Sequence, residues 1–140
     1  MTGESFDEVY WADGRPVVEA VARIDWLLRD HNNGKHRRID LELLHRLWGM
    51  QEKLDTDQPF EILSGFRTRE TNQKLIERGI KASANSLHMQ GMAVDLRVPN
   101  RRPRALYRLA LSLGGGGTGC YPRRGFVHLD SGPTRRWMGA

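Results

Sequence analysis

Residues 86–98 have the sequence SLHMQGMAVDLRV, which passes from a loop into an alternating strand. From Ala93 onward, apolar and polar side chains alternate, so Val94 and Leu96 would face one side of a strand and Asp95 the other. Gly91 lets the preceding backbone turn closely, with positive φ if needed. His88 and Asp95 are residue types that bind metals, but the stretch alone also fits a loop that enters an ordinary half-buried strand.

A second alternating stretch, FVHLD at residues 126–130, supplies a third candidate ligand. In a strand, Val127 and Leu129 would face the core, while Phe126, His128 and Asp130 would share the opposite face. If this strand lies beside residues 93–98, His128 converges on Asp95, and His88 reaches the same place from the loop. A set of two histidines and one carboxylate suits a catalytic zinc with an open position for water, which serves amide hydrolysis. Packed or surface histidines are the alternative.

Helical periodicity dominates the first half of the chain, and strands gather in the second half. We expect helices from about Pro16 to Asp30, from a cap at Asp40 to Leu54, from a cap at Thr68 to Gly79, and from Pro103 to Leu113. We expect strands at 60–63, 93–98, 118–121 and 126–130, the last two forming a hairpin, and a loop at 80–87. This order predicts an α+β fold, with a single domain over residues 1–140.

The composition limits the classes of partner and cofactor. The formal net charge of +5 suits a polyanion, either nucleic acid or an anionic cell-wall polymer. The arginines are not interleaved with aromatic residues as a nucleic-acid stacking platform requires. The single cysteine, Cys120, excludes an internal disulfide and a cysteine-cluster metal site, and we expect it to be packed.

Three tryptophans and three further histidines are expected to have structural roles and not to belong to the site. We expect Trp11, Trp26 and Trp48 to lie in the core, and we expect surface or packing roles for three histidines (His31, His36 and His45). No apolar run approaches the length of a membrane span. The first residues, MTGESFDEVYW, do not have the pattern of a signal peptide, which indicates either a cytoplasmic protein or an export segment missing from this chain.

Three motifs, in order along the chain, resemble those of one family. SLHMQGMAVD resembles the SxHxxGxAxD signature of the M15-like zinc D-Ala-D-Ala carboxypeptidases, and ILSGFRTRETNQKL resembles their upstream SGYRS…N segment. GGGGTGCYPRRGFVHLDSGPTRRW is similar to the GGVGxYP…FVHxDxGPxRxW ending of the YcbK-like (DUF882) branch. The resemblance covers about residues 30–137.

The resemblance implies a zinc peptidase that cuts peptide cross-links of peptidoglycan by attack of a metal-bound water. It implies a small antiparallel sheet flanked by helices, the hedgehog/DD-peptidase-like fold, with Zn²⁺ on its open face. His88, Asp95 and His128 match the metal ligands. Relatives of this kind are exported, which implies a periplasmic or cell-wall-associated protein. We expect a monomer with peptidoglycan as its partner, no nucleic acid and no membrane span.

Two catalytic roles are open to more than one interpretation. By similarity Arg67 binds a substrate carboxylate or steadies the oxyanion, and the alternative is an arginine that anchors the loop. Many relatives have an acidic residue three positions before the last histidine ligand, where this chain has Gly125. Asp130 is therefore our candidate for the general base, with orientation of a ligand or of the substrate amine as the alternative. The missing acid also leaves open a non-catalytic peptidoglycan-binding module that retains the fold.

Overall fold

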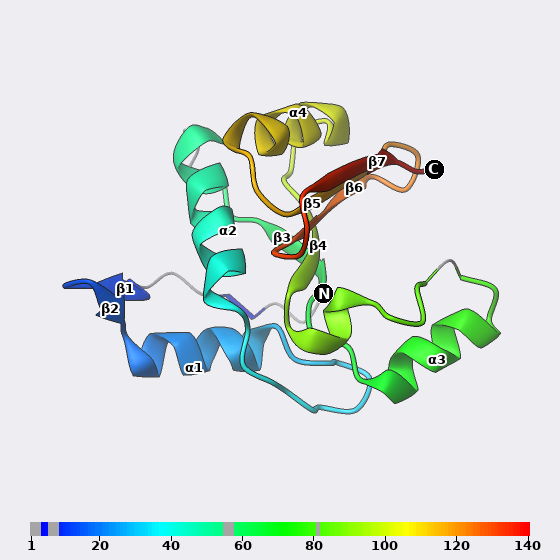
Figure 1. The fold of residues 1–140 in the computed structure, drawn as a ribbon, viewed down its shortest axis with the longest axis horizontal. Helices are drawn as coiled ribbons and strands as arrows, with labels where there is room; N and C mark the ends of the chain where they lie inside the picture. The colour runs from blue at the N-terminus through cyan, green and yellow to red at the C-terminus, as the bar shows by residue number, and fades with distance from the viewer. Residues whose placement is uncertain (1–3, 6–8, 55–57, 81) are drawn as a thin grey trace.

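The computed structural model describes residues 4–5, 9–54, 58–80 and 82–140. Parts of the N-terminal stretch used for the signal-peptide prediction, and Lys81 of the predicted loop, lie outside the described residues. Figure 1 shows the elements, which in chain order are β1 (Trp11–Ala12), β2 (Arg15–Pro16), α1 (Val18–Leu27), α2 (Leu41–Leu54), β3 (Glu61–Ser64), α3 (Arg69–Glu77), the short 3-10 helix η1 (Leu87–Gln90), β4 (Ala93–Arg97), α4 (Pro103–Leu113), β5 (Gly117–Tyr121), β6 (Phe126–Asp130) and β7 (Arg135–Met138). The predicted α+β class is confirmed.

The main sheet has the strand order β3-β4-β6-β5-β7. Neighbouring strands from β3 to β5 are antiparallel, as predicted, and β7 joins the edge parallel to β5. The strand β7 was not predicted, because its sequence RRWM does not alternate. It also pairs with β5 and not with β6, the strand that precedes it in the chain. The β4–β6 register places Asp95 directly opposite His128, so the condition for the convergence of these two side chains is met.

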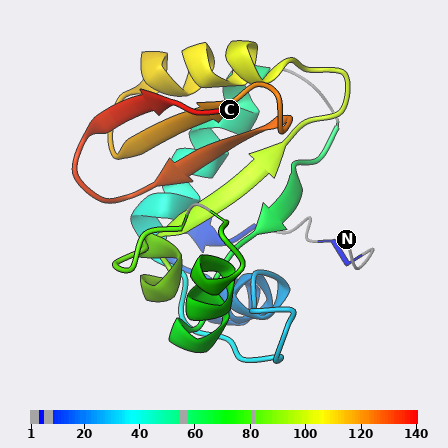
Figure 2. The ribbon, with the colours of Figure 1, turned by 90° about the vertical axis from the view of Figure 1, so that its right-hand side faces the viewer.

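One face of the sheet carries the core. The alternating apolar side chains of β4 and β6 are fully buried and belong to one cluster with residues of α2 and α4: Leu43, Met50, Val94, Leu96, Leu106, Ala110, Val127 and Leu129. Each of the large aliphatic side chains contributes about 1.5–3 kcal/mol by leaving water. Figure 2 shows α2 behind this sheet and α4 along its top, while α1 and α3 lie at the bottom, at the other end of the molecule. The opposite face of β4 and β6 is therefore available for polar side chains.

Hydrogen bonds at the starts of α3 and α2 connect these helices to other segments near that polar face. The predicted Thr68 cap is confirmed, because its hydroxyl accepts a hydrogen bond from the Thr71 amide at 3.3 Å. The buried carboxylate of Asp30 in turn accepts from the Thr68 amide and hydroxyl, each at 3.0 Å. At the start of α2, Asp40 accepts from the Ser131 hydroxyl at 2.6 Å, which joins this helix to the end of β6. None of the helices in the described segments is both long and apolar enough to cross a membrane.

Two predictions about the N-terminal third are wrong. Pro16 does not lie in the first turn of a helix; it pairs with Trp11 in the β1–β2 hairpin, and α1 begins at Val18. The tryptophans are not core residues, because Trp11, Trp26 and Trp48 are 39%, 48% and 56% exposed. Two of them make local surface contacts instead, Trp11 with the edge of His45 and Trp26 with the Arg29 guanidinium. The indole ring buries one side against such neighbours and leaves the other in water.

Candidate metal centre

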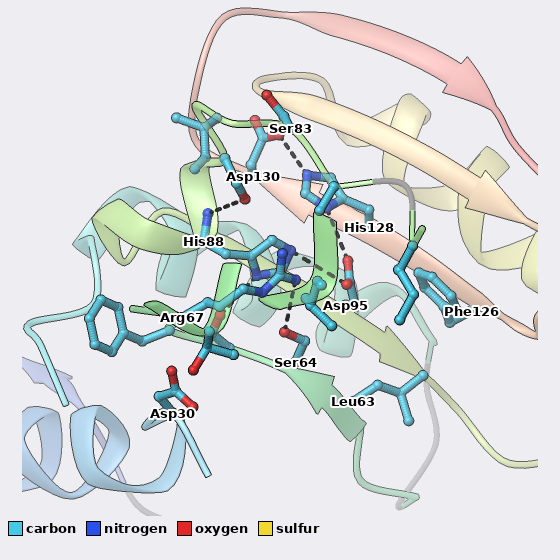
Figure 3. A pocket seen from close by; sticks show the side chains of 18 of the residues that line it. Asp30, Leu63, Ser64, Arg67, Ser83, His88, Asp95, Phe126, His128 and Asp130 are labelled. Atoms are coloured by element: carbon cyan, nitrogen blue, oxygen red, sulfur yellow. Dashed lines mark hydrogen bonds and ion pairs between the residues drawn. The ribbon is translucent and has the colours of Figure 1, made fainter. Parts of the chain in front are cut away.

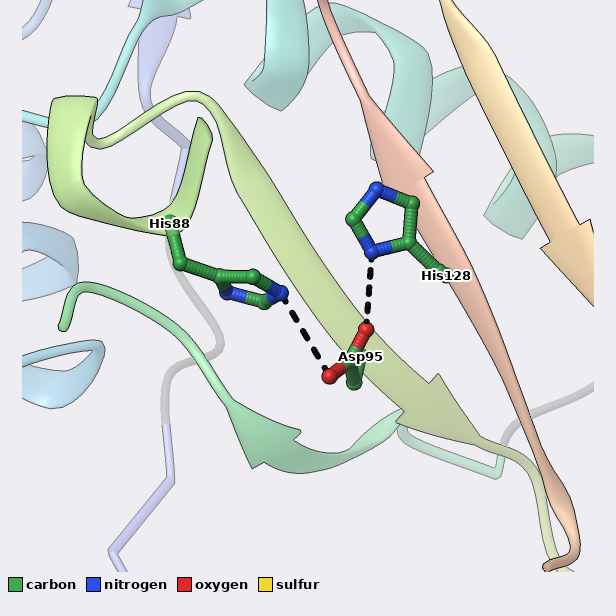
Figure 4. Close-up of side chains that lie close together, drawn as sticks. All are labelled: His88, Asp95 and His128. Atoms are coloured by element: carbon green, nitrogen blue, oxygen red, sulfur yellow. Dashed lines mark hydrogen bonds and ion pairs between the residues drawn. The ribbon is translucent and has the colours of Figure 1, made fainter. Parts of the chain in front are cut away.

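The three predicted metal ligands converge on the open face of the sheet. His88 comes from η1, Asp95 from β4 and His128 from β6, as Figure 4 shows. One donor atom from each residue lies within 4.8 Å of the other two. His88 Nε2 is 3.4 Å from one carboxylate oxygen of Asp95, and His128 Nδ1 is 3.0 Å from the other. Two imidazoles and one carboxylate therefore surround a common point.

The His88 imidazole is fixed in one orientation by the backbone. Its Nδ1 lies 2.8 Å from the Gly65 carbonyl oxygen, which can only accept, so Nδ1 carries the proton. Nε2 is therefore the nitrogen that faces Asp95, as a donor when it carries a proton and as a metal ligand when it does not. The Ser86 hydroxyl accepts from the His88 amide at 3.2 Å, which braces this loop.

Gly91 forms the predicted turn between η1 and β4. Its φ is 68°, in the left-handed region that favours glycine, and its carbonyl accepts from the Asp40 amide at 2.9 Å. A Cβ at this position would lie 2.5 Å from the Arg38 carbonyl oxygen, closer than side chains approach. The turn therefore needs glycine both for its conformation and for space, and it sets the approach of His88 to Asp95.

Gly91→Ala is expected to lower the free energy of unfolding by at least about 2 kcal/mol, and to weaken metal binding through displacement of His88. Gly79→Ala is the matched control, because Gly79 has φ of 78° but no atom within 4 Å of its Cβ position. The control is expected to lose only about 1 kcal/mol, the cost of the backbone conformation alone. Urea denaturation measures both values, and equal losses would contradict the argument from space.

The His128 imidazole lies between two carboxylates. Its Nδ1 faces Asp95, and its Nε2 is 2.7 Å from Asp130 Oδ2. Asp130 is 0% exposed and accepts further hydrogen bonds from the amides of Gly117 and Gly132 at 2.8 and 3.0 Å. Arg135, from the unpredicted strand β7, adds a two-bond ion pair to the same carboxylate at 3.0 and 2.8 Å.

These contacts decide the charges of the cluster. Burial opposes ionisation of both aspartates, but hydrogen bonds outweigh it. Asp95 accepts from His128 and His88. Asp130 accepts from His128, Arg135 and the Gly117 amide. These hydrogen bonds hold the pKa of each carboxyl well below its usual range. Burial also opposes the charged form of His128, but its hydrogen bonds to Asp130 and Asp95 raise its pKa above the ordinary 6.5. Without a metal, the cluster therefore favours an imidazolium between two carboxylates.

Arg67 reaches the same groove from the end of β3. Its guanidinium donates to the Asn72 side-chain oxygen at 2.9 Å and to the Ser64 hydroxyl at 3.3 Å. Its backbone amide donates to the His88 carbonyl at 3.0 Å, and this hydrogen bond fixes the Arg67 backbone relative to the His88 backbone. Burial lowers the pKa of Arg67, although Asp95 and Asp30 oppose this. Figure 3 shows Arg67 beside Asp95.

The far side of His128 is covered by residues of β5 and β7. The Trp137 indole lies 5.1 Å from the His128 ring and donates to the Tyr121 hydroxyl at 2.8 Å. Gly119 makes room for this indole, because a Cβ there would overlap it. Cys120 is buried in the core cluster, next to Val127 rather than His128 in the register, so the expected packing role is confirmed.

The candidate residues all line one groove of about 650 Å³. The groove brings together the predicted His88, Asp95, His128, Arg67 and Asp130. Sequence reasoning missed the contributions of Arg135 and Asn72. Asn72 matches the asparagine of the SGYRS…N segment, which was the available signal. Arg135 is the arginine of the GPxRxW ending, but the motif does not show its contact with Asp130, which depends on how β7 folds back.

Two imidazoles and one carboxylate in one groove are a donor set of the kind that metal-dependent hydrolases use. Comparison with known families specifies the class further. A family model described as "Peptidoglycan L,D-endopeptidase MepK" matches residues 1–137, and the chain belongs to this family, Peptidase_M15_2. The predicted resemblance to the YcbK-like, M15-like group is thereby confirmed.

Curated relatives agree with this assignment. The chain is 36% identical over 137 residues to "Peptidoglycan L,D-endopeptidase MepK" of Escherichia coli K12, covering 97% of this chain and 75% of the relative. The protein of the same name from Shigella flexneri matches equally well. The "Probable peptidoglycan L,D-endopeptidase MepK" of Haemophilus influenzae is 30% identical over 118 residues, which cover 84% of this chain and 63% of that protein.

Proposed function

We propose that the protein is a zinc-dependent endopeptidase that hydrolyses peptide cross-links of peptidoglycan. The observation that carries this proposal is the convergence of His88, Asp95 and His128 within the groove. The names of the E. coli and H. influenzae relatives support the substrate class and the reaction. The proposal also includes action as a monomer in the compartment that holds peptidoglycan.

The donor set fits zinc. His88 Nε2, one oxygen of Asp95 and His128 Nδ1 would hold the ion, because His88 Nδ1 and His128 Nε2 already have acceptors elsewhere. A histidine ligand whose second nitrogen donates to a carbonyl or carboxylate is the usual arrangement in zinc sites. When bound, zinc supplies a Lewis acid that activates water and polarises an amide carbonyl.

Arg67 is proposed to contact the substrate. Its guanidinium lies on the groove wall, tied to Asn72 and Ser64 by one hydrogen bond each, and keeps further donors for a ligand. A fixed cation at this position can bind a peptide carboxylate or the oxyanion that develops during amide cleavage. The two hydrogen bonds hold the guanidinium in place before the substrate arrives, which lowers the entropy lost on binding.

Asp130 is proposed to position His128 rather than to act as the general base. A base must receive a proton, but the Asp130 carboxylate is fully buried and accepts from His128, two backbone amides and Arg135. These donors stabilise the ionised form and leave little basicity. The same contacts suit the orientation of an imidazole ligand, the second role considered from the sequence.

Zinc affinity is expected to fall as the pH falls through the His128 pKa, which lies above the ordinary 6.5. The reason is that a proton on Nδ1 competes with the metal for the same lone pair. Zinc titrations with a competing chelator, at a series of pH values, measure this dependence. His128→Ala is expected to bind zinc weakly at every pH, and an affinity of the unaltered protein that did not change with pH would contradict the assigned ligand atom.

Digestion of purified peptidoglycan sacculi tests the proposed function. The protein is expected to release cross-linked muropeptides as smaller products, to lose this activity with a zinc chelator, and to regain it when zinc is restored. Chromatography of the digests measures the result. If sacculi remain unchanged while zinc is bound, the chain is a peptidoglycan-binding module and not an endopeptidase.

A further inference from the structure

Four arginines line the groove, and the guanidinium of one of them makes no ion pair with the described residues. Arg29 pairs with Glu4, Arg67 donates to Asn72 and Ser64, and Arg135 pairs with Asp130. The fourth is Arg124, in the β5–β6 turn. Within the described part of the chain, no carboxylate forms an ion pair with it.

A stacked aromatic pair supports the Arg124 side chain. Tyr121 and Phe126 face each other across the hairpin with ring centroids 4.6 Å apart and planes 16° from parallel. The Arg124 Cζ atom lies 5.0 Å from the Phe126 centroid and 5.7 Å from that of Tyr121. Because a guanidinium stacks through its flat face, the N–H groups at its edge stay available for a planar anion such as a carboxylate.

The position of this platform relates it to the proposed reaction. Phe126 is two residues before His128 on the same face of β6, so its side chain lies about 7 Å from that of His128. In Figure 3, Phe126 and Arg67 lie on opposite sides of Asp95. An extended peptide held across the metal centre would therefore meet Arg67 on one side and Arg124 on the other, about two residues from the cleaved amide.

The charge of the groove favours an acidic ligand at this place. Asp95 and Asp130, two carboxylates that line the same groove, are already bonded to the histidines and to Arg135. We propose that Arg124, held on the Tyr121–Phe126 pair, is a specificity residue that binds a free carboxylate of the cross-linked peptide. This inference rests on the proposed function and adds the chemical group that the enzyme selects.

Two forms of one substrate test the inference: a cross-linked stem-peptide dimer with free carboxylates and the same dimer with its carboxylates amidated. The unaltered protein is expected to prefer the free-acid form by about ten-fold in kcat/KM, mainly through KM. Arg124→Ala is expected to lose this preference, with little change for the amidated form, and Arg124→Lys is expected to keep part of it. Arg123→Ala is the matched control, because Arg123 shares the turn but does not line the groove.

Each outcome bears on a different claim. A preference for the free acid that persists in Arg124→Ala, or an equal loss in Arg123→Ala, would overturn the role of Arg124 and leave the proposed function standing. If the unaltered protein cleaves neither form, the proposed function fails. Equilibrium binding of the same two dimers then tests Arg124 alone: the Arg124→Ala variant is expected to bind the free-acid dimer about ten-fold more weakly, and an unchanged affinity would contradict the inference.

Discussion

Replacing His88 with alanine is expected to remove zinc from the protein and to lower cross-link cleavage by at least about 1,000-fold in kcat/KM. His88 is the ligand from outside the two paired strands. Among the described residues, the cluster contains no third imidazole that could replace it. Loss of the metal removes several kcal/mol of transition-state stabilisation, which corresponds to this change in rate. Metal analysis and muropeptide chromatography measure the two effects together.

The control for this variant is His36→Ala. His36 is exposed, makes a T-shaped contact with Trp26 and does not line the groove, so its removal is expected to leave zinc content and activity unchanged. Circular dichroism establishes that both variants fold. If His88→Ala retained zinc at full occupancy, the ligand assignment would be wrong, and if it lost zinc but kept its activity, the metal would have no part in the reaction.

Asp130→Asn is expected to weaken zinc binding by about 10–100-fold, with activity partly restored by added zinc. Asparagine keeps the size of the side chain but offers only one oxygen acceptor, so the His128 orientation and the Arg135 pair are both weakened. A general base would behave differently. Its loss would leave zinc affinity intact and lower kcat in a way that zinc cannot restore.

Glu61→Gln provides the matched control for Asp130→Asn. Glu61 forms an ion pair with Arg97 on the same sheet, and it does not line the groove. Its substitution is expected to change stability by less than about 1 kcal/mol and to leave zinc affinity unchanged. Normal zinc affinity together with normal turnover in Asp130→Asn would contradict both roles considered for Asp130.

The sequence predicted the metal cluster because its residues follow local rules. Period-two alternation placed Asp95 and His128 on polar faces of their strands, and Gly91 identified the turn after His88. The register that sets Asp95 opposite His128 was not predicted, since it depends on how two distant strands pair. The ordered family motifs supplied what the local pattern could not.

The errors and omissions have a common physical origin. Trp11 and Trp26 were assigned to the core by hydrophobicity, yet each finds a partner at the surface in a neighbouring ring or cation. Arg135 was not recognised as the partner of Asp130, because parallel pairing of β7 with β5 is a contact between segments that are not adjacent along the hairpin. Such contacts are set by the folded chain as a whole and leave no periodic pattern in the sequence.

The most direct test of the account is the X-ray absorption spectrum of the zinc-loaded protein at the zinc edge. The assignment of His88, Asp95 and His128 predicts a first shell of nitrogen and oxygen only, with the multiple-scattering signal of two imidazoles. Thiolate sulfur in that shell would require Cys120, the single cysteine, which is buried on the other face of the sheet. A spectrum with sulfur, or one without imidazole scattering, would contradict the metal centre on which the proposed function depends.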